Sequence, residues 1–300
     1  MITLKELKLS LAIALLLFAT TVHSAQRIIS ADLGATQIIQ HLDATSFLVA
    51  ANLSSRHLLK KNEVANIGYH RALSTEGLLS LKPTILVGSE AMGPESTLDI
   101  LARTGTKIVQ YQTPYTLEQL RTNVRVISTA LDQEEHATKV LHALNQSINA
   151  LNALRTHYQT ALFLLSAQGG HGGIAGMNTG GSAFLSLLGL TNLADYEGYR
   201  KVSAEGLVAL DPDVIIVASA NNKVEEQTES STNSDTNINS NTQSKGVYRL
   251  TRAAKAGRVF TINPRSLIAG LSFESIEQAI ALKSALARQP KLSAALGLSK

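Results

Sequence analysis

The stretch from Gly68 to Pro83 reads GYHRALSTEGLLSLKP, and a second stretch from Gly198 to Pro212 reads GYRKVSAEGLVALDP. Allowing one gap, both carry Gly-Tyr, then Ser-x-Glu-Gly-Leu, then Leu-x-Pro before an apolar run. We expect each copy to begin a helix, with Ser74 or Ser203 as the N-cap residue and a glutamate in the first turn. Convergence of helix-then-strand units would explain the apolar spacing, but it leaves the shared Gly-Tyr unexplained. The repeat therefore favours two lobes of one design.

Short apolar runs alternate with segments of helical periodicity on either side of the chain's midpoint. The expected strands are 27–30, 47–51, 85–88, 107–110, 161–166, 214–218 and 259–262. The expected helices include 33–41, 97–104, 183–188 and 275–286. Strands that alternate with helices predict parallel βαβ units, in which helices cover both faces of the sheet. We therefore predict an α/β fold with two Rossmann-like lobes, each built on a parallel sheet.

The middle of the chain has helical spacing for about forty residues from Thr116 onward. The acidic stretch 132–135 (DQEE) marks a new helix start, because negative charge suits a first turn. A helix from Gln133 to His157 would be about 37 Å long at 1.5 Å per residue, and its position predicts a strut between two domains. We assign a signal peptide to residues 1–25, an N-terminal α/β lobe to 26–132, the linking helix to 133–158 and a C-terminal α/β lobe to 159–300.

The first residues have the pattern of a secretory signal peptide. Lys5 and Lys8 precede an apolar run over 9–22, and small residues follow at Ser24 and Ala25. The run is short for a membrane-spanning helix, although a retained N-terminal anchor is the alternative. The chain has no cysteine, which excludes a lipoprotein anchor and any disulfide framework. We therefore expect a freely diffusing periplasmic protein.

Composition narrows the classes of partner. The formal net charge is +4, and the basic residues form no arginine-rich stripe with interleaved aromatics, so we do not expect nucleic acid as a partner. Tryptophan is absent, which argues against a sugar site built on stacked rings. The segment 221–245 is rich in Asn, Ser, Thr, Gln and Glu and cannot bury enough apolar surface to offset its ordering entropy. We expect it to be a disordered surface insertion in the C-terminal lobe.

Two α/β lobes joined by one long helix resemble the substrate-binding proteins of cobalamin, siderophore and haem ABC importers. The resemblance implies the class III periplasmic binding protein fold and a monomeric carrier that serves a permease and ATPase complex in the inner membrane. In that class each lobe presents a glutamate that pairs with permease arginines, and the resemblance assigns this docking role to Glu76 and Glu205. Both glutamates also suit the positive end of a helix dipole, and the two roles are compatible.

Four stretches resemble the haem-binding branch of that class. They are 67–78, 88–94, 175–181 and 250–258, and the resemblance covers most of the mature chain but fails at the polar insertion. It implies haem b as the transported ligand and Tyr69 as the axial ligand to its iron. A phenolate suits ferric iron, and tyrosine ligation of haem is known. Free tyrosine titrates near pH 10, so ligation at neutral pH needs the ferric ion and the Arg71 guanidinium to favour the phenolate. The alternative is that Tyr69 packs at the rim of a lobe with its hydroxyl in water.

Other residues are candidate haem contacts. Arg71 and Arg265 suit the haem propionates. His171 lies among glycines at 169–173, directly after an expected strand, where an imidazole could reach the ligand from the second lobe or simply be solvated. The further candidates Met92, Met177 and Asn178 lie in the stretches that resemble the haem-binding branch.

Two rival interpretations are another ligand on the same fold and an enzyme. A ferric siderophore would call for more cationic and aromatic residues, and a bare metal ion would need several His and carboxylate side chains to converge, whereas the eight His here are scattered. A cobalamin ligand on the same fold stays open.

Residues 170–175 match a loose G-x-G-x-x-A dinucleotide pattern. The glycine-rich residues 176–181 that follow are poor helix formers, so we expect no helix N-terminus for a pyrophosphate. We therefore rank a secreted nucleotide-cofactor enzyme as remote and expect no catalysis.

Overall fold

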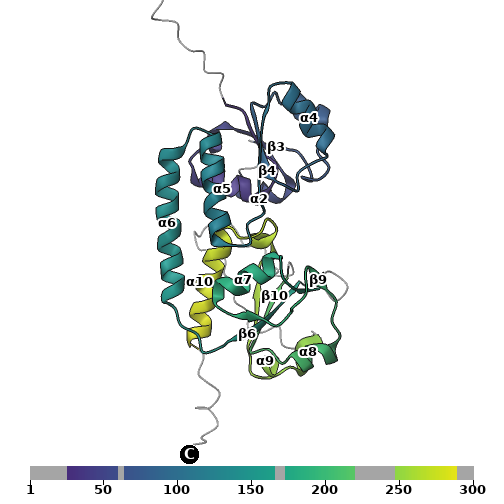
Figure 1. The fold of residues 1–300 in the computed structure, drawn as a ribbon, viewed down its shortest axis with the longest axis vertical. Coiled ribbons are helices and arrows are strands. Elements are labelled where there is room, and N and C mark those ends of the chain that lie inside the picture. Colours follow the sequence, from purple (N-terminus) through teal and green to yellow (C-terminus); the bar gives the residue numbers. More distant parts are fainter. Residues whose placement is uncertain (1–25, 60–63, 166–172, 220–246, 289–300) are drawn as a thin grey trace, which may run out of the picture.

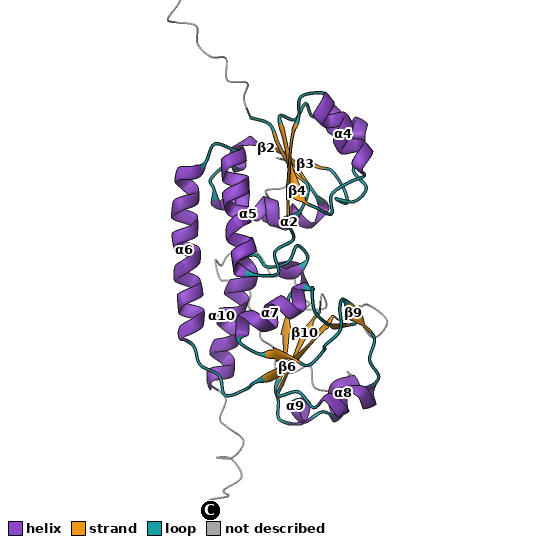
Figure 2. Cartoon of the chain, viewed as in Figure 1, coloured by secondary structure: helices purple, strands orange, loops and turns teal. Residues whose placement is uncertain are grey.

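The computed structural model describes residues 26–59, 64–165, 173–219 and 247–288 (Figure 1). The expected signal peptide 1–25, the insertion 221–245 and His171 lie outside the described residues. The described chain forms two α/β lobes, one above the other in Figure 2, with long helices running along one side of both. This is the arrangement of two α/β lobes joined by a long helix that the sequence predicts.

The N-terminal lobe is built on a parallel five-stranded sheet in the order β3-β2-β1-β4-β5. Its strands are β1 (Ile28–Ser30), β2 (Leu48–Ala51), β3 (Ala65–Asn66), β4 (Ile85–Ser89) and β5 (Lys107–Tyr111). Its helices are α2 (Leu33–His41), η1 (Thr45–Phe47), η2 (Leu53–Leu58), α3 (Thr75–Ser80), α4 (Glu95–Arg103) and α5 (Leu117–Ala130). Buried apolar clusters on both faces of the sheet confirm that helices cover it on each side.

The buried Asp32 joins three strands of this sheet where the strand order reverses between β1 and β4. It caps α2 by accepting from the Ala35 amide (2.9 Å), and its other oxygen accepts from the Ser89 amide (2.6 Å). The Tyr111 hydroxyl also donates to it. Burial and the nearby Asp32 carboxylate raise the pKa of Tyr111, so this hydroxyl remains a donor. The carboxyl ends of β1, β4 and β5 are thereby held together.

The C-terminal lobe carries a mixed sheet in the order β11-β10-β6-β7-β9, with β8 also paired to β6. Its strands are β6 (Thr160–Leu165), β7 (Ile174–Ala175), β8 (Thr191–Asn192), β9 (Tyr199–Arg200), β10 (Val214–Ala218) and β11 (Val259–Ile262). Its helices are α7 (Gly180–Leu188), α8 (Ala204–Leu210), η3 (Val247–Leu250), α9 (Arg252–Lys255), η4 (Pro264–Leu267) and α10 (Phe273–Arg288).

The prediction of a wholly parallel sheet is wrong for one side of this lobe. β7 pairs with β6 and with β9 in antiparallel fashion. Only eight residues separate Leu165 from Ile174, fewer than the dozen or so that a parallel crossover requires, which is consistent with the antiparallel pairing of β7 with β6. β6, β10 and β11 are parallel as predicted.

A helix does begin within the glycine-rich stretch 176–181, against our expectation. Thr179 caps α7 by accepting from the Ser182 amide (3.1 Å). A Cβ at Gly181 would lie 2.5 Å from the Phe163 ring and 2.7 Å from the Ala175 Cβ. Glycine is therefore required here for close packing of α7 on β6, and this packing outweighs its poor helix propensity.

The linking helix α6 (Glu134–Ala153) belongs to both lobes. Ala137 and Val140 pack in the core of the N-terminal lobe, whereas Leu144, Ile148 and Leu151 pack in the core of the C-terminal lobe. Figures 1 and 2 show α5 and α10 beside it. The helix ends at Ala153, before the predicted end at residue 158, because the chain becomes extended at residue 154 on its way to β6.

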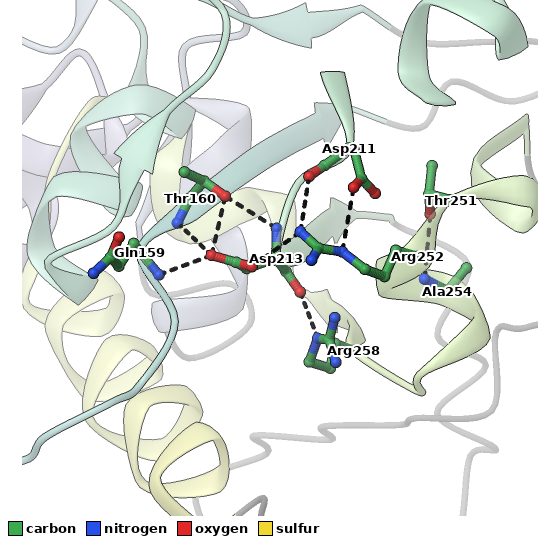
Figure 3. Close-up of polar contacts among 8 residues, drawn as sticks. All are labelled: Gln159, Thr160, Asp211, Asp213, Thr251, Arg252, Ala254 and Arg258. Atoms are coloured by element: carbon green, nitrogen blue, oxygen red, sulfur yellow. Dashed lines mark hydrogen bonds and ion pairs between the residues drawn. The ribbon is translucent and has the colours of Figure 1, made fainter. Parts of the chain in front are cut away.

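A polar cluster joins the two parts of the C-terminal lobe that flank residues 220–246 (Figure 3). Asp213 accepts from the amides of Gln159 (3.0 Å) and Thr160 (3.1 Å) and from the Thr160 hydroxyl (3.1 Å). Arg252 forms ion pairs with Asp211 (3.3 Å) and Asp213 (3.4 Å). The buried Arg258 donates to the Asp213 carbonyl (2.6 Å). The start of β10 is thus tied to β6 and to the chain that follows the insertion.

Candidate functional site

The carboxyl edges of the two sheets face each other. The Leu271 amide, which follows β11 and η4, donates to the carbonyl of Pro114, which follows β5 (2.7 Å). Gly270 has a positive φ of 78°, and any Cβ at this position would collide with the Pro114 carbonyl. In α/β sheets, ligands bind outside the carboxyl ends of the strands. The loops at these two edges are therefore where a ligand shared by the lobes would lie.

Six of the eleven exposed large apolar side chains among the described residues lie in these loops or beside them. We call them the interlobe surface, and its members are Leu53, Tyr69, Tyr115, Met177, Tyr199 and Ile268. Tyr69 is 57% exposed and Tyr199 is 45% exposed. A single exposed apolar residue needs no explanation, but several at one place indicate a binding surface.

The loop that carries Tyr69 is held by backbone hydrogen bonds. Gly68 adopts a positive φ of 77°; its amide donates to the Asn66 side chain (3.0 Å), and its carbonyl accepts from the Leu53 amide (3.0 Å). The Tyr69 carbonyl accepts from the Ala72 amide (3.0 Å). The Tyr69 ring rests against the His70 imidazole, with 4.5 Å between centroids. The backbone is thus fixed while the phenol stays accessible.

Arg71 connects this loop electrostatically to Tyr115, which lies after β5. Burial and Glu90 raise the pKa of Tyr115, and the Arg71 guanidinium partly opposes them. Burial also lowers the pKa of His70; Asp32 opposes this effect, and Arg71 adds to it. The Arg71 side chain is exposed. An exposed guanidinium therefore lies near the Tyr115 phenol, where it can pair with an anionic group of a ligand.

Tyr199 contributes from the C-terminal lobe, and it was not among the predicted site residues. Burial raises its pKa, hydrogen bonds to Gly181 and Thr179 partly lower it again, and Tyr115 raises it further. The interaction with Tyr115 joins the two lobes. Tyr199 is the tyrosine of the second Gly-Tyr copy and so the counterpart of Tyr69. The repeat could have identified it from the sequence.

The other candidates differ in their placement. Met177 is exposed and is hydrogen bonded through its backbone to Tyr196 (2.6 Å) and Gly198 (3.0 Å). The neighbouring Asn178 is exposed, and its amide donates to Glu197 (3.2 Å). Arg265 lies in η4, is exposed, and acts electrostatically on Glu274.

Met92 is wrong as a direct ligand contact. Its side chain is 4% exposed and packs in the core of the N-terminal lobe with Ile29, Leu73 and Leu86. The Met92 sulfur would lie 2.8 Å from a Cβ at Gly88, so it fills the space next to that glycine. An apolar side chain after a strand can point to the core or to solvent, and the sequence does not distinguish the two.

Glu76 and Glu205 are exposed in the first turns of α3 and α8. The predicted caps are confirmed: Ser74 accepts from the Gly77 amide (3.2 Å), and Ser203 accepts from the Gly206 amide (3.1 Å). Hydrogen bonds from its own backbone amide and from Ser203 lower the pKa of Glu205. This carboxylate therefore stabilises its helix start and remains exposed to a partner.

Two further findings apply to the part of the chain that the structure describes. No three His, Cys, Asp or Glu side chains there converge in a way that could hold a metal ion. Nor does any helix within 26–288, the undescribed segments apart, have the length and apolar character needed to cross a bilayer.

Comparison with known proteins identifies the family. Residues 28–266 match the family of periplasmic binding proteins. A vitamin B12-binding protein of Yersinia pseudotuberculosis is 24% identical over 225 residues, which cover 71% of this chain and 78% of that protein. The periplasmic haem-binding protein HutB of Vibrio cholerae has a TM-score of 0.76 at 29% identity, covering 88% of this chain and 99% of that one. A periplasmic haem-binding protein of Pseudomonas aeruginosa has a TM-score of 0.70 at 27% identity, with 89% and 94% covered. The chain therefore belongs to the periplasmic binding protein family, whose members bind solutes and are not catalysts.

Proposed function

We propose that this protein captures haem at the interlobe surface and delivers it to an ABC importer, with Tyr69 as the axial ligand of the ferric iron. The observation that carries the proposal is the exposed Tyr69 phenol on a loop held by backbone hydrogen bonds, with exposed apolar side chains in the neighbouring loops. Haem b is a flat, largely apolar ligand with iron at its centre and two carboxylates at one edge. It needs an apolar surface, one anionic donor and cations near its rim.

The residues around Tyr69 supply these elements. A phenolate is a suitable donor for ferric iron. Arg71 is exposed two residues further along the chain and can pair with a propionate. Arg265 is a second candidate for a propionate, from the C-terminal lobe. Two haem-binding proteins with the same fold, at 29% and 27% identity, support this choice of ligand.

We assign Tyr199 to the opposite face of the ligand. Because its pKa is raised, this residue stays a neutral phenol in the free protein and is suited to ring packing or to hydrogen bonding. Met177 and Asn178 extend the same side. His171 remains a candidate second axial ligand and lies outside the described residues.

Delivery involves the two lobes together. We propose that Glu76 on the N-terminal lobe (26–132) and Glu205 on the C-terminal lobe (159–300) pair with arginines of the permease. The segment 1–25 would direct the chain to the periplasm as a cleavable signal. Replacing both glutamates by alanine should spare haem binding but reduce the stimulation of ATPase activity in the reconstituted importer.

Cobalamin is the second candidate, because the B12-binding relative matches 71% of this chain at 24% identity. A corrin carries its own metal ligands and amide groups, so its binding does not depend on a phenolate. Binding proteins for ferric siderophores share the fold, but the residues of the interlobe surface give no specific support for a siderophore as the ligand.

The experiment is a titration of the purified protein with hemin and, in parallel, with cyanocobalamin. We expect a saturable Soret change with hemin and a high-spin ferric spectrum typical of phenolate ligation. Tyr69→Phe should remove that spectrum and weaken hemin binding at least tenfold, about 1.4 kcal/mol. Tyr199→Phe is the matched control and should keep the phenolate spectrum. Saturable binding of cyanocobalamin without a hemin response would replace haem by cobalamin as the ligand.

A further inference from the structure

The lobes meet at a second place, between α2 of the N-terminal lobe and the start of α10. The Gln37 amide nitrogen Nε2 donates to Oε2 of Glu274 (3.3 Å). One helical turn further along α2, the His41 ring lies on the Phe273 ring, with centroids 3.9 Å apart. These contacts are formed by side chains far apart in the sequence, and none of them belongs to the interlobe surface.

Gln37 has an unusual environment. The residue is 5% exposed, and its carbonyl oxygen Oε1 is fully buried without a hydrogen-bond partner among the described residues. It lines a cavity of about 10 Å³ between α2, α5 and the loop before α10, together with Ile38, Leu120, Leu271 and Phe273. That volume is at the lower limit for one water molecule. A buried acceptor left unpaired is unfavourable and uncommon in folded proteins.

The ionisation state of Glu274 explains why this oxygen is left over. A carboxylate only accepts hydrogen bonds, so the donor end of the Gln37 amide must face it, and the carbonyl end then points away from it. A protonated carboxyl group offers one donor and one acceptor. It can pair side by side with an amide through two hydrogen bonds, which uses the Gln37 oxygen as well.

We propose that Gln37 and Glu274 form a proton-linked latch between the lobes, which closes with two hydrogen bonds when Glu274 takes up a proton. The latch includes no member of the interlobe surface, but Arg265, a candidate propionate partner, acts electrostatically on Glu274. It would hold the lobes together more firmly in an acidic medium than at neutral pH.

Burial of Glu274 favours proton uptake, and most of the polar and charged groups around it oppose this effect. Burial raises the pKa of its carboxyl group; His57 on η2 lowers it, Glu277 on α10 raises it, and Arg265 on η4 and the Gln37 hydrogen bond lower it. The net direction is upward. A folded-state pKa above the unfolded value of about 4.3 means that the stabilisation is full below the unfolded value. It is lost as the pH rises through the folded-state pKa.

His41, on the same face of α2, acts in the opposite sense. Burial lowers its pKa, so acidification charges it in the unfolded chain before the folded protein and destabilises the fold. The pH profile of the unmodified protein therefore mixes both groups. A comparison of variants that all retain His41 isolates the contribution of Glu274.

The test is Glu274→Gln, whose amide offers a donor and an acceptor at every pH and so mimics the protonated acid. Thermal unfolding midpoints are measured from pH 4.5 to 7.5 for the full chain, for this variant and for Glu277→Gln, which removes an exposed carboxylate from the same helix. We expect Glu274→Gln to unfold several degrees above the parent at pH 7.5, with a difference that shrinks as the pH falls towards 4.5. Glu277→Gln should show a much smaller difference.

A second pair of proteins, with and without Glu274→Gln in the Gln37→Leu variant, separates the latch from the effect of simply removing the Glu274 charge. In Gln37→Leu, the partner amide is gone, so Glu274→Gln should no longer raise the midpoint at pH 7.5. Stabilisation by Glu274→Gln that persists in the Gln37→Leu background would overturn the proposal, as would a difference from the parent that does not change with pH.

Discussion

Replacement of Gly181 by alanine tests whether the start of α7 is packed as tightly as the structure indicates. Gly181 lies in the first turn of α7 and faces β6. The new Cβ would lie 2.5 Å from Cδ1 and 2.7 Å from Cγ of the Phe163 ring, and 2.7 Å from the Ala175 Cβ. Phe163 is among the most deeply buried side chains and lies edge-on to the buried Phe184 ring. The helix or the strand must therefore shift.

The cost follows from two opposing effects. Alanine is favoured over glycine in a helix by about 0.5–1 kcal/mol, whereas overpacking a filled core costs about 1–3 kcal/mol. Overpacking dominates, and we expect a net loss of about 1–2 kcal/mol. For a protein of this size, that lowers the thermal unfolding midpoint by about 2–6 °C. Because Gly181 is also a hydrogen-bond partner of Tyr199, hemin affinity should fall as well.

Gly77→Ala is the matched control, because Gly77 occupies the third position of α3 and its added Cβ would meet only Ser74 atoms, at 3.3 Å or more. Its unfolding midpoint should stay the same or rise slightly. The packing argument fails if calorimetry shows the two alanine variants with equal midpoints, or Gly181→Ala above the parent.

Three further predictions concern the C-terminal lobe and can be checked by calorimetry or urea unfolding. Burial raises the pKa of Asp213, but hydrogen bonds from Gln159 and Thr160 and the charge of Arg252 outweigh it, so the net pKa is lowered. Asp213→Asn should therefore destabilise the protein near pH 7, and the difference should shrink as the pH falls through the lowered pKa; a difference independent of pH would contradict this. Arg252→Ala should cost at most about 1 kcal/mol, because its ion pairs are partly exposed and screened. Arg258→Ala should cost more, about 2 kcal/mol, because this buried guanidinium donates to the Asp213 carbonyl and lies over the Tyr158 ring; equal losses for the two arginines would refute the distinction.

Much of the fold could be predicted because its signals are local. Helix α2 has the predicted bounds because its apolar residues recur with helical spacing, and β10 and β11 have theirs because each is a short apolar run. The caps at Ser74 and Ser203 follow from side chains that act on their own helix. The two-residue strands β3, β7, β8 and β9 are not predicted, because a strand of that length has no periodicity to detect.

The candidate site is harder to predict from the sequence, because it depends on which way each side chain points and on contacts between residues that are far apart in the chain. Tyr69 and Met92 lie in neighbouring loops, yet the Tyr69 side chain is exposed and the Met92 side chain is buried. Tyr199 could have been found by carrying the Gly-Tyr repeat through to its second copy. The pairing of Gln37 with Glu274 could not, since no local pattern relates residues so far apart in the chain.

The packing of the long helices limits how the lobes can move. Leu120 of α5 belongs to the core of the C-terminal lobe, although most of that helix covers the N-terminal sheet. Leu141 of α6 and Phe273 of α10 each pack against both cores. A wide opening would have to separate these side chains and expose apolar surface, at a cost of about 25 cal/mol per Å². Small adjustments at the interlobe surface avoid that cost. We therefore expect a ligand to enter and leave through movements of loops such as 112–116 and 268–272, and the Gln37–Glu274 contact to set how far those loops separate.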